Sequence, residues 1–202
     1  MKNIEPSSNF KELLNLLHDI NEVDVSDDFF YLQLYSGEYK YEEYHFLGDD
    51  DWLQNDLSTH FGDRFIEFAG ETDGSKFCLW FYDGLVGEPP IVYFGSDANF
   101  VTIAPSMSEF ICLLINCDIP DGYETKPKNI WYKLDKEGIA ELKEEEPKVY
   151  AGFMKRKEIA STMIACDKRK NIIQNFKKHP KFHKWIKKVN QIDEQTYEKK
   201  EN

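Results

Sequence analysis

Residues 65–116 decide the fold of this 202-residue chain, and they read FIEFAGETDGSKFCLWFYDGLVGEPPIVYFGSDANFVTIAPSMSEFICLLIN. Short runs rich in aromatic and β-branched residues have the length and composition of strands. These runs are residues 65–69, 76–82, 91–94 and 100–104. Between them, Asp73-Gly74 and Gly95-Ser96-Asp97 are turn signals, because glycine and aspartate tolerate the backbone angles of a tight reversal. The pattern predicts an antiparallel meander.

A helix is expected directly after the last of these strands. Ser106 can accept a hydrogen bond from a free amide at the helix start, and Glu109 three positions later completes a capping-box pattern. The apolar stripe of this helix consists of Phe110, Leu113 and Leu114, widened by Ile111 and Ile115. The stretch as a whole predicts an α+β fold, with a mostly antiparallel sheet packed against helices.

The residues before this stretch predict two more helices and a hairpin. Asn9 and Glu12 have capping-box spacing, and a helical apolar stripe follows at Phe10, Leu13, Leu14, Leu17 and Ile20. Residues 29–35 and 39–47 alternate in polarity and are expected to pair as a hairpin. A short helix is expected from Trp52 to Phe61, with one of the preceding aspartates as its cap.

The chain after residue 116 is expected to be looser and then helical again. Residues 117–150 are interpreted as a connecting segment of uncertain order, with one further strand within 130–134. His179-Pro180 restarts a helix, because proline at the first turn loses no hydrogen bond. Its stripe is expected to pack on the body of the same chain and consists of Phe182, Trp185, Ile186, Val189 and Ile192. The predicted organisation is an α+β domain over residues 1–150 and a basic helical extension over residues 151–202.

Charge is distributed unevenly along the chain, whose net charge is −12. Residues 1–150 hold 31 acidic and 11 basic side chains, whereas residues 151–202 hold 6 acidic and 14 basic ones. An acidic body repels nucleic acid and favours basic partners. Seven lysines between Lys170 and Lys188 offer phosphate contacts, but no nucleic-acid motif accompanies them. Nucleic acid is therefore not an expected partner, and the simpler interpretation of each charge run is a solvated face.

The four cysteines, Cys78, Cys112, Cys117 and Cys166, form no CxxC pair. Cys78 and Cys112 lie inside apolar runs, where cysteine behaves as a small hydrophobic residue. The polar N-terminus carries no signal peptide, so a cytoplasmic protein is expected. No apolar run approaches the roughly 18 residues of a membrane span, and no membrane association is expected.

No catalytic, cofactor or metal site can be identified from the residue pattern. Ser96, Ser106 and Ser108 lack the G-x-S-x-G turn that presents a nucleophile. His179 and His183 have a metal-compatible spacing, but no third ligand accompanies them. Three adjacent aspartates at residues 49–51 lack the alternate spacing of a calcium loop and suit helix capping better. A non-enzymatic role without cofactors is the resulting expectation.

The meander resembles the SUKH superfamily, bacterial domains similar to the fungal Smi/Knr cell-wall regulators. The segments that carry the resemblance are residues 65–69, 73–75, 79–81, 88–97 and 108–114, together with the looser match of residues 179–186. The resemblance implies a non-enzymatic α+β binding scaffold. It also implies an immunity protein, which neutralises a toxin of a polymorphic secretion system, often a nuclease.

The charge pattern agrees with this implication, since nuclease toxins bind phosphate through basic clefts and an acidic aromatic surface complements them. The partner-binding residues expected on polar loops are Asp49, Asp50, Asp51, Glu71 and Asp73, with Trp52 and Tyr82 as aromatic anchors. The alternative is a regulatory scaffold that resembles the fungal cell-wall regulators and has no toxin partner.

Overall fold

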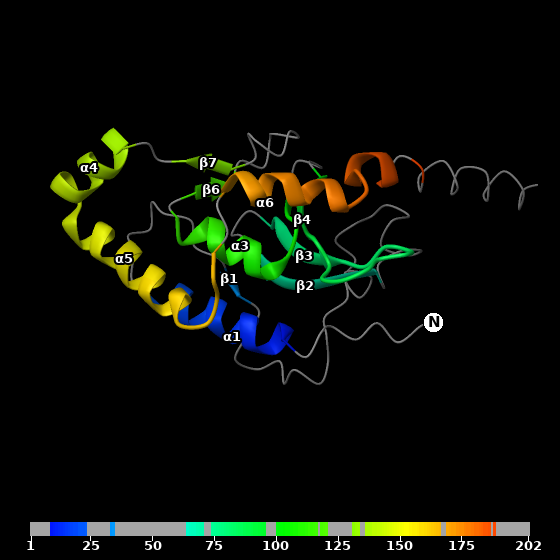
Figure 1. Ribbon diagram of the computed structural model, residues 1–202, viewed down its shortest axis with the longest axis horizontal. Helices are drawn as coiled ribbons and strands as arrows, with labels where there is room; N and C mark the ends of the chain where they lie inside the picture. The colour runs from blue at the N-terminus through cyan, green and yellow to red at the C-terminus, as the bar shows by residue number, and fades with distance from the viewer. Residues whose placement is uncertain are drawn as a thin grey trace, which may run out of the picture.

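The computed structural model describes residues 9–23, 33–34, 64–70, 74–95, 100–116, 118–120, 131–133, 136–166, 169–186 and 188. Its centre is a five-stranded sheet in which every neighbouring pair is antiparallel and the strands follow chain order (Figure 1). The strands are β1 (Gln33–Leu34), β2 (Phe65–Gly70), β3 (Lys76–Trp80), β4 (Ile91–Phe94) and β5 (Phe100–Ala104). The predicted α+β fold and antiparallel meander are confirmed. In β1, Gln33 pairs with Gly70, and the expected hairpin partner, residues 39–47, lies outside the described residues.

The sheet is buried on both faces, because successive side chains of a strand point to opposite sides. In β3, Phe77 and Leu79 belong to one apolar cluster, whereas Cys78 and Trp80 belong to another. A bulge between Glu67 and Ala69 of β2 shifts the register. We call the side of Phe77 the first face and the side of Trp80 the second face.

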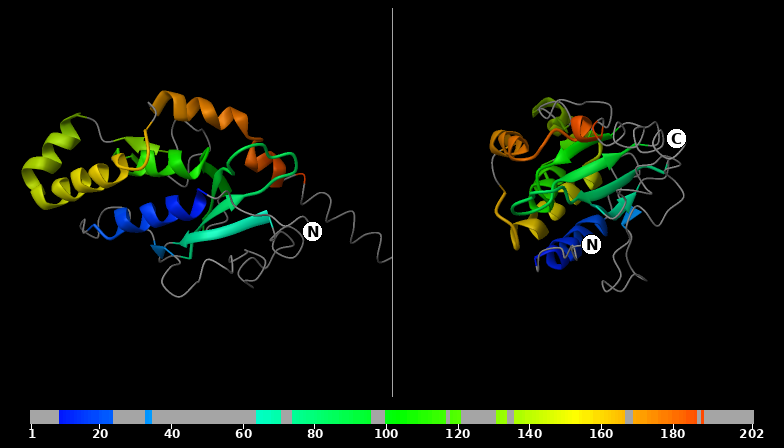
Figure 2. Two further views of the ribbon diagram at one scale, coloured as in Figure 1. Left: turned by 60° about the horizontal axis from the view of Figure 1, so that its bottom comes forward. Right: turned by 90° about the vertical axis from the view of Figure 1, so that its right-hand side faces the viewer.

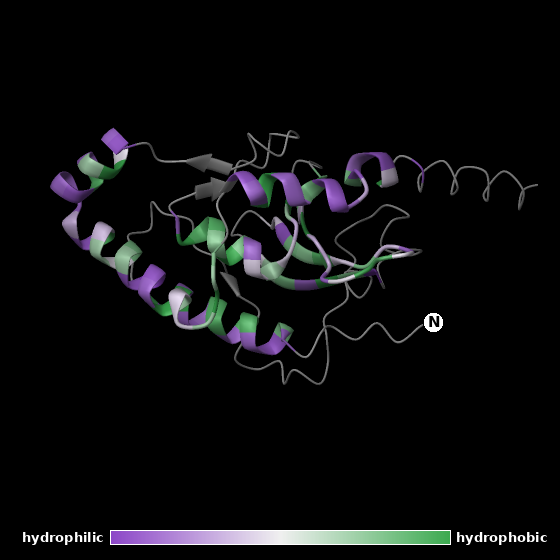
Figure 3. Cartoon of the chain, viewed as in Figure 1, coloured by the Kyte–Doolittle hydropathy of each residue, from purple (hydrophilic) through white to green (hydrophobic). Residues whose placement is uncertain are grey.

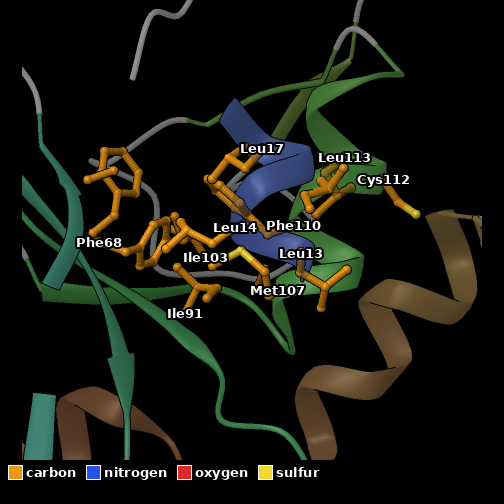
Figure 4. Packing of buried hydrophobic residues seen from close by; sticks show 14 of the residues in the cluster. Leu13, Leu14, Leu17, Phe68, Ile91, Ile103, Met107, Phe110, Cys112 and Leu113 are labelled. Carbon is orange, nitrogen blue, oxygen red and sulfur yellow. The ribbon is translucent and has the colours of Figure 1, made fainter. Parts of the chain in front are cut away.

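Two helices cover the first face, α1 (Phe10–Asn21) and α3 (Met107–Leu114) (Figure 4). The predicted stripe of α1 is confirmed, since all five of its residues are buried, and Leu16 joins them. In α3, Phe110 is fully buried, whereas Leu114 is only partly buried at the edge of the cluster. This apolar cluster is the main core of the molecule.

The two predicted helix caps have different outcomes. At α3 the Ser106 hydroxyl accepts a hydrogen bond from the Glu109 amide at 3.2 Å, as predicted. At α1 the prediction is wrong, because the Asn9 side chain makes no capping bond. Asn9 already has helical backbone angles, φ −77° and ψ −14°, whereas a side-chain cap requires a more extended backbone.

Residues 118–161 contain more regular structure than the sequence pattern predicts. β6 (Asp118–Pro120) and β7 (Trp131–Lys133) form a two-stranded antiparallel sheet, which confirms the strand expected near residue 130. The expectation of a poorly ordered connection is otherwise wrong, because α4 (Lys136–Glu145) and α5 (Pro147–Ser161) follow. Leu142 is the buried residue of α4 and packs on α5, so this helix needs only a narrow apolar stripe. Residue 150, the expected domain boundary, lies inside α5.

The α4–α5 hairpin extends away from the sheet, and α5 runs back beside α1 (Figure 1). A buried arginine joins these two helices at the end of α1. The guanidinium of Arg156 donates through Nη2 to the Val23 carbonyl oxygen at 3.1 Å. Burial lowers the pKa of Arg156. Because a carbonyl at a helix C-terminus lacks an intrahelical donor, this contact satisfies it and fixes α5.

The C-terminal segment, defined here as residues 169–188, crosses from one face of the sheet to the other. It begins with α6 (Arg169–Asn175) and the 3-10 helix η3 (Phe176–Lys178), and residues 182–186 form a further helical turn (Figure 2). Ile172 and Phe176 belong to the first-face cluster. Phe182 and Ile186 belong to the second-face cluster. The predicted packing of this stripe on the body is confirmed for these two residues and for the partly buried Trp185, whereas Val189 and Ile192 lie outside the described residues.

A disulfide joins Cys112 of α3 to Cys166, with 5.4 Å between their Cα atoms. Cys112 is buried in the first-face cluster, as its apolar run predicts, but the sequence pattern did not predict that its sulfur is bonded. Its sulfur points away from the labelled apolar side chains (Figure 4). Cys78, by contrast, is a buried free thiol, as predicted. None of the helices described is long and apolar enough to cross a membrane.

Candidate functional site

Polar and titratable side chains gather where three segments meet: the β3–β4 loop (residues 81–90), the start of α3 and the C-terminal segment. We call this group the junction cluster, and it consists of Tyr82, Glu88, Ser106, Glu109, Asn175 and His179. Its members are connected by hydrogen bonds and by electrostatic interactions. Titratable groups with shifted pKa values often mark functional sites, so this cluster is the first candidate.

The cap of α3 is also a docking point for the C-terminal segment. The Ser106 hydroxyl donates to Oε2 of Glu109 at 3.0 Å while it accepts the Glu109 amide. The other carboxylate oxygen of Glu109 accepts a hydrogen bond from Nδ2 of Asn175 at 2.5 Å. A local capping motif is thereby joined to a residue 66 positions away.

Glu88 shares the Ser106 hydroxyl with Glu109. Burial raises the pKa of Glu88, the hydrogen bond with Ser106 lowers it, and the nearby charge of Glu109 raises it again. A hydroxyl has one proton to donate, so it cannot serve both carboxylates at once. When Glu88 is protonated it can donate to Ser106, and the hydroxyl proton then remains available to Glu109.

His179 fastens the C-terminal segment at the point where it passes between the two faces. Burial lowers the pKa of His179, a hydrogen bond to the Pro105 backbone raises it, and Lys178 lowers it. Because proline has no backbone N–H, the Pro105 carbonyl must accept from a ring N–H. The Tyr82 hydroxyl lies 3.0 Å from Nδ1 of His179. A neutral ring protonated at Nε2 satisfies both contacts, with the Tyr82 hydroxyl donating to Nδ1.

Tyr82 leads from the junction cluster into the aromatic packing of the second face. Its ring lies 4.8 Å from the ring of Trp80, between centroids. Trp80 in turn contacts Phe182 at 4.7 Å and Trp185 at 5.3 Å. The hydroxyl and the ring of Tyr82 therefore both contribute to docking the C-terminal segment.

The β3–β4 loop presents an apolar tip to solvent. Gly84 and Gly87 have φ angles of 81° and 89°, which glycine adopts without strain. The Leu85 amide donates to the Tyr82 carbonyl at 3.1 Å, and Asp83 pairs with Arg64 at 2.9 Å. Between the two glycines, Val86 is 91% exposed. The loop is thus a defined turn with an apolar residue at its tip and the exposed carboxylate of Asp83 nearby.

A second polar group lies inside the second face. Nζ of Lys76 is 3.0 Å from Oε2 of Glu67, and both side chains are nearly inaccessible. Burial raises the pKa of the neighbouring Cys78 thiol well above its usual value, and the charge of Glu67 adds to this effect. Because the thiolate is the reactive form, Cys78 remains an unreactive thiol.

The geometry of the junction cluster suits docking better than catalysis. Ser106 uses its hydroxyl as a helix cap, and its proton goes to a carboxylate that also holds Asn175. His179 is occupied by Tyr82 and Pro105. Within the described part of the chain, no group of three or more potential metal-ligating side chains occurs. What the arrangement does is hold three segments together.

Of the expected partner-binding residues, only Tyr82 is described, and it lies in the junction cluster. Asp49, Asp50, Asp51, Trp52, Glu71 and Asp73 lie outside the described residues. The sequence pattern did not predict the roles of Glu88 and Asn175. The sequence marks these two residues only by their position. Glu88 precedes a Pro-Pro pair, and Asn175 lies four residues before His179-Pro180, where a new helix was expected to begin.

Comparison with known proteins gives no match, whether with family models, with curated proteins or with solved structures.

Proposed function

We propose that this chain is a non-enzymatic protein-binding domain of the SUKH type. Its partner is a basic protein, and the chain acts as an immunity protein that neutralises a nuclease-type toxin. The observation that carries the proposal is the charge of residues 1–150, 31 acidic against 11 basic side chains. Such a surface accelerates the encounter with a basic partner and opposes binding to acidic ones.

The arrangement of the acidic residues supports this proposal. Apart from the buried Glu67 and the half-buried Glu88 and Glu109, carboxylates whose exposure is described in residues 1–150 are exposed, and they lie on or next to α1 and α4 and at Asp83. Charge at solvent-exposed positions contributes to steering more than to folding stability. The helices α1 and α4 thus carry negative charge on their outer sides.

The β3–β4 loop supplies an exposed apolar residue close in sequence to an exposed carboxylate. Interfaces are stabilised mainly by a few apolar or aromatic residues surrounded by polar ones. Val86, 91% exposed and close in sequence to Asp83, fits that description. In this proposal the loop acts together with the acidic residues 49–51, 71 and 73 and the aromatic Trp52 expected from the sequence.

A two-step experiment tests the proposal. The tagged chain is incubated with lysate of its native organism at low and at high salt, and retained proteins are identified by mass spectrometry. We expect one basic protein that is lost as salt rises. That protein is then expressed alone and together with the chain, and growth is measured.

Toxicity alone and rescue by the chain would support the proposal, and rescue should weaken with Val86→Asp. The matched control is Met163→Asp, which changes another exposed apolar residue. A set of cell-wall or signalling proteins would favour the regulatory scaffold. A captured protein without toxicity, or no basic protein at all, would contradict the immunity role.

A further inference from the structure

The C-terminal segment has an unusual charge composition for so acidic a protein. Residues 169–188 contain eight lysine and arginine side chains and no aspartate or glutamate. Six of the lysines are exposed, and they are Lys170, Lys177, Lys178, Lys181, Lys184 and Lys188. No ion pair joins them to another residue of the described part of the chain. The segment therefore presents lysines to solvent at its start and then at positions 177, 178, 181, 184 and 188.

The fold determines which side of this segment faces outward. Ile172 and Phe176 pack into the first-face cluster, and Phe182 and Ile186 pack into the second-face cluster. With its apolar side chains turned inward, the segment keeps its lysines on the outside. Figure 3 shows the hydrophilic turns along α6 and the turns after it. Sequence alone left open whether the lysines lie against the acidic body or point to solvent.

We propose that the exposed lysines of the C-terminal segment bind the phosphate backbone of nucleic acid without sequence specificity. Lysine ammonium groups neutralise phosphates and release condensed counterions, which is the main term of non-specific binding. No residue that reads bases is needed for such binding. The acidic body acts on a bound phosphate backbone only from a distance, whereas the lysines contact the phosphates directly, so the local attraction exceeds the screened repulsion.

Two other anionic partners fit the same lysines less well. A membrane-surface helix needs an apolar side to insert into the lipid, and here Phe182 and Ile186 are already buried against the sheet. An acidic protein would need apolar or aromatic contacts, and lysine is depleted at protein interfaces. A phosphate backbone requires cations alone, which is what the segment offers.

The test measures fluorescence anisotropy of the full chain with labelled duplex DNA and with single-stranded RNA, each over a salt series. We expect binding at low salt to at least one probe, with log affinity falling linearly against log salt. In the variant Lys177→Gln/Lys181→Gln/Lys184→Gln the slope should become shallower by about 2.7 on the duplex, since each lost contact removes about 0.9. The relative response to DNA and RNA shows which backbone is preferred.

The matched control is Lys148→Gln/Lys155→Gln/Lys157→Gln, which removes three exposed lysines from α5. The control should bind within about twofold of the unaltered chain, since its lysines lie outside the segment. A thermal melt of both variants shows whether the segment still docks. Overturning results are no binding to either probe at low salt, equal loss in both variants, or binding only to anionic phosphatidylglycerol vesicles. Each of these results would leave the proposed toxin partner untouched, because that partner is recognised by the acidic surface.

Discussion

The two faces of the sheet are covered in different ways. The first face is closed by α1 and α3, and α3 follows directly after β5. The second face is closed by Phe182 and Ile186, which lie more than 80 residues beyond the strand β4 that they cover. The first face is therefore covered mainly by α1 and α3, to which the C-terminal segment adds Ile172 and Phe176, whereas the second face depends on the end of that distant segment. Local stability is expected to differ accordingly.

The largest expected effect comes from two cavity-forming substitutions, one on each face of the sheet. Phe110→Ala removes a fully buried ring from the first face and should lower the free energy of unfolding by about 3–5 kcal/mol. Phe182→Ala removes a ring of similar burial from the second face, and we expect a smaller loss of about 2–3 kcal/mol. The helical turn that carries Phe182, residues 182–186, can open while Ile172 and Phe176 stay packed in the main core. Urea denaturation of both variants measures the difference.

Hydrogen exchange adds a spatial readout to this comparison. In Phe182→Ala, faster exchange should be confined to the C-terminal segment, whereas Phe110→Ala should accelerate exchange in the strands as well. Uniform acceleration in both variants would show that the two faces unfold as one unit.

Loss of the disulfide is expected to have the next largest effect. The bridge joins α3 to Cys166, which lies just before the C-terminal segment. Cys112 and Cys166 are separated by 54 positions, and closing a loop of that size stabilises a protein by up to about 4 kcal/mol. Peptide mapping under non-reducing conditions should recover the Cys112–Cys166 pair. Reductant should then lower the melting temperature of the unaltered chain and leave that of Cys166→Ser unchanged. If reductant left the melting temperature of the unaltered chain unchanged, the disulfide could not be a source of its stability.

The difference between the faces also explains what the sequence could predict. The strands and the stripe of α3 were predictable because alternation and helical periodicity are local signals. The stripe of α1 followed from the same periodicity, although its cap did not, since Asn9 has helical backbone angles. The helix α4 escaped prediction because it buries little more than Leu142, which leaves no clear stripe.

The candidate site was harder to predict than the fold. The junction cluster combines residues from three segments, and hydrogen bonds such as Asn175–Glu109 depend on tertiary placement. No periodicity marks Glu88 or His179 as neighbours of the α3 cap. Tyr82 was selected as an aromatic anchor for a partner, and the structure shows it half-buried and hydrogen-bonded to His179 of the same chain. The chemistry of such a cluster becomes visible only once the chain is folded.

A smaller effect is expected at the Tyr82–His179 contact, which lies at the crossing between the faces. Tyr82→Phe keeps the ring packing on Trp80 and removes only the hydroxyl that faces Nδ1. One such hydrogen bond contributes about 1 kcal/mol. We expect that loss in urea denaturation, with faster exchange confined to the C-terminal segment. Tyr150→Phe is the control, since Tyr150 lies on α5 in a separate cluster. An equal loss in the control would argue against a specific contact.

The smallest expected effect is on pH dependence, where Glu88 and His179 act with opposite sign. The folded pKa of His179 lies below its ordinary value of 6.5, so its contribution is complete above that pH and is lost as pH falls through the folded pKa. The folded pKa of Glu88 lies above its ordinary value of 4.5, so its contribution is complete below that pH and is lost as pH rises through the folded pKa.

Glu88→Gln removes the contribution of the Glu88 carboxyl to the pH dependence of stability. The amide of the variant can donate to the Ser106 oxygen, as a protonated Glu88 can, and the repulsion from Glu109 disappears. We expect a gain in the free energy of unfolding at pH 7 of less than about 1 kcal/mol, and no gain below pH 4.5. Urea denaturation between pH 4.5 and pH 7 should therefore show that the free energies of unfolding of the unaltered chain and the variant diverge as pH rises. The pH dependence that remains in the variant should follow the titration of His179. Parallel curves would mean that the Glu88 carboxyl has the same pKa in the folded and the unfolded chain. The α3 cap would then hold the C-terminal segment without repulsion between Glu88 and Glu109.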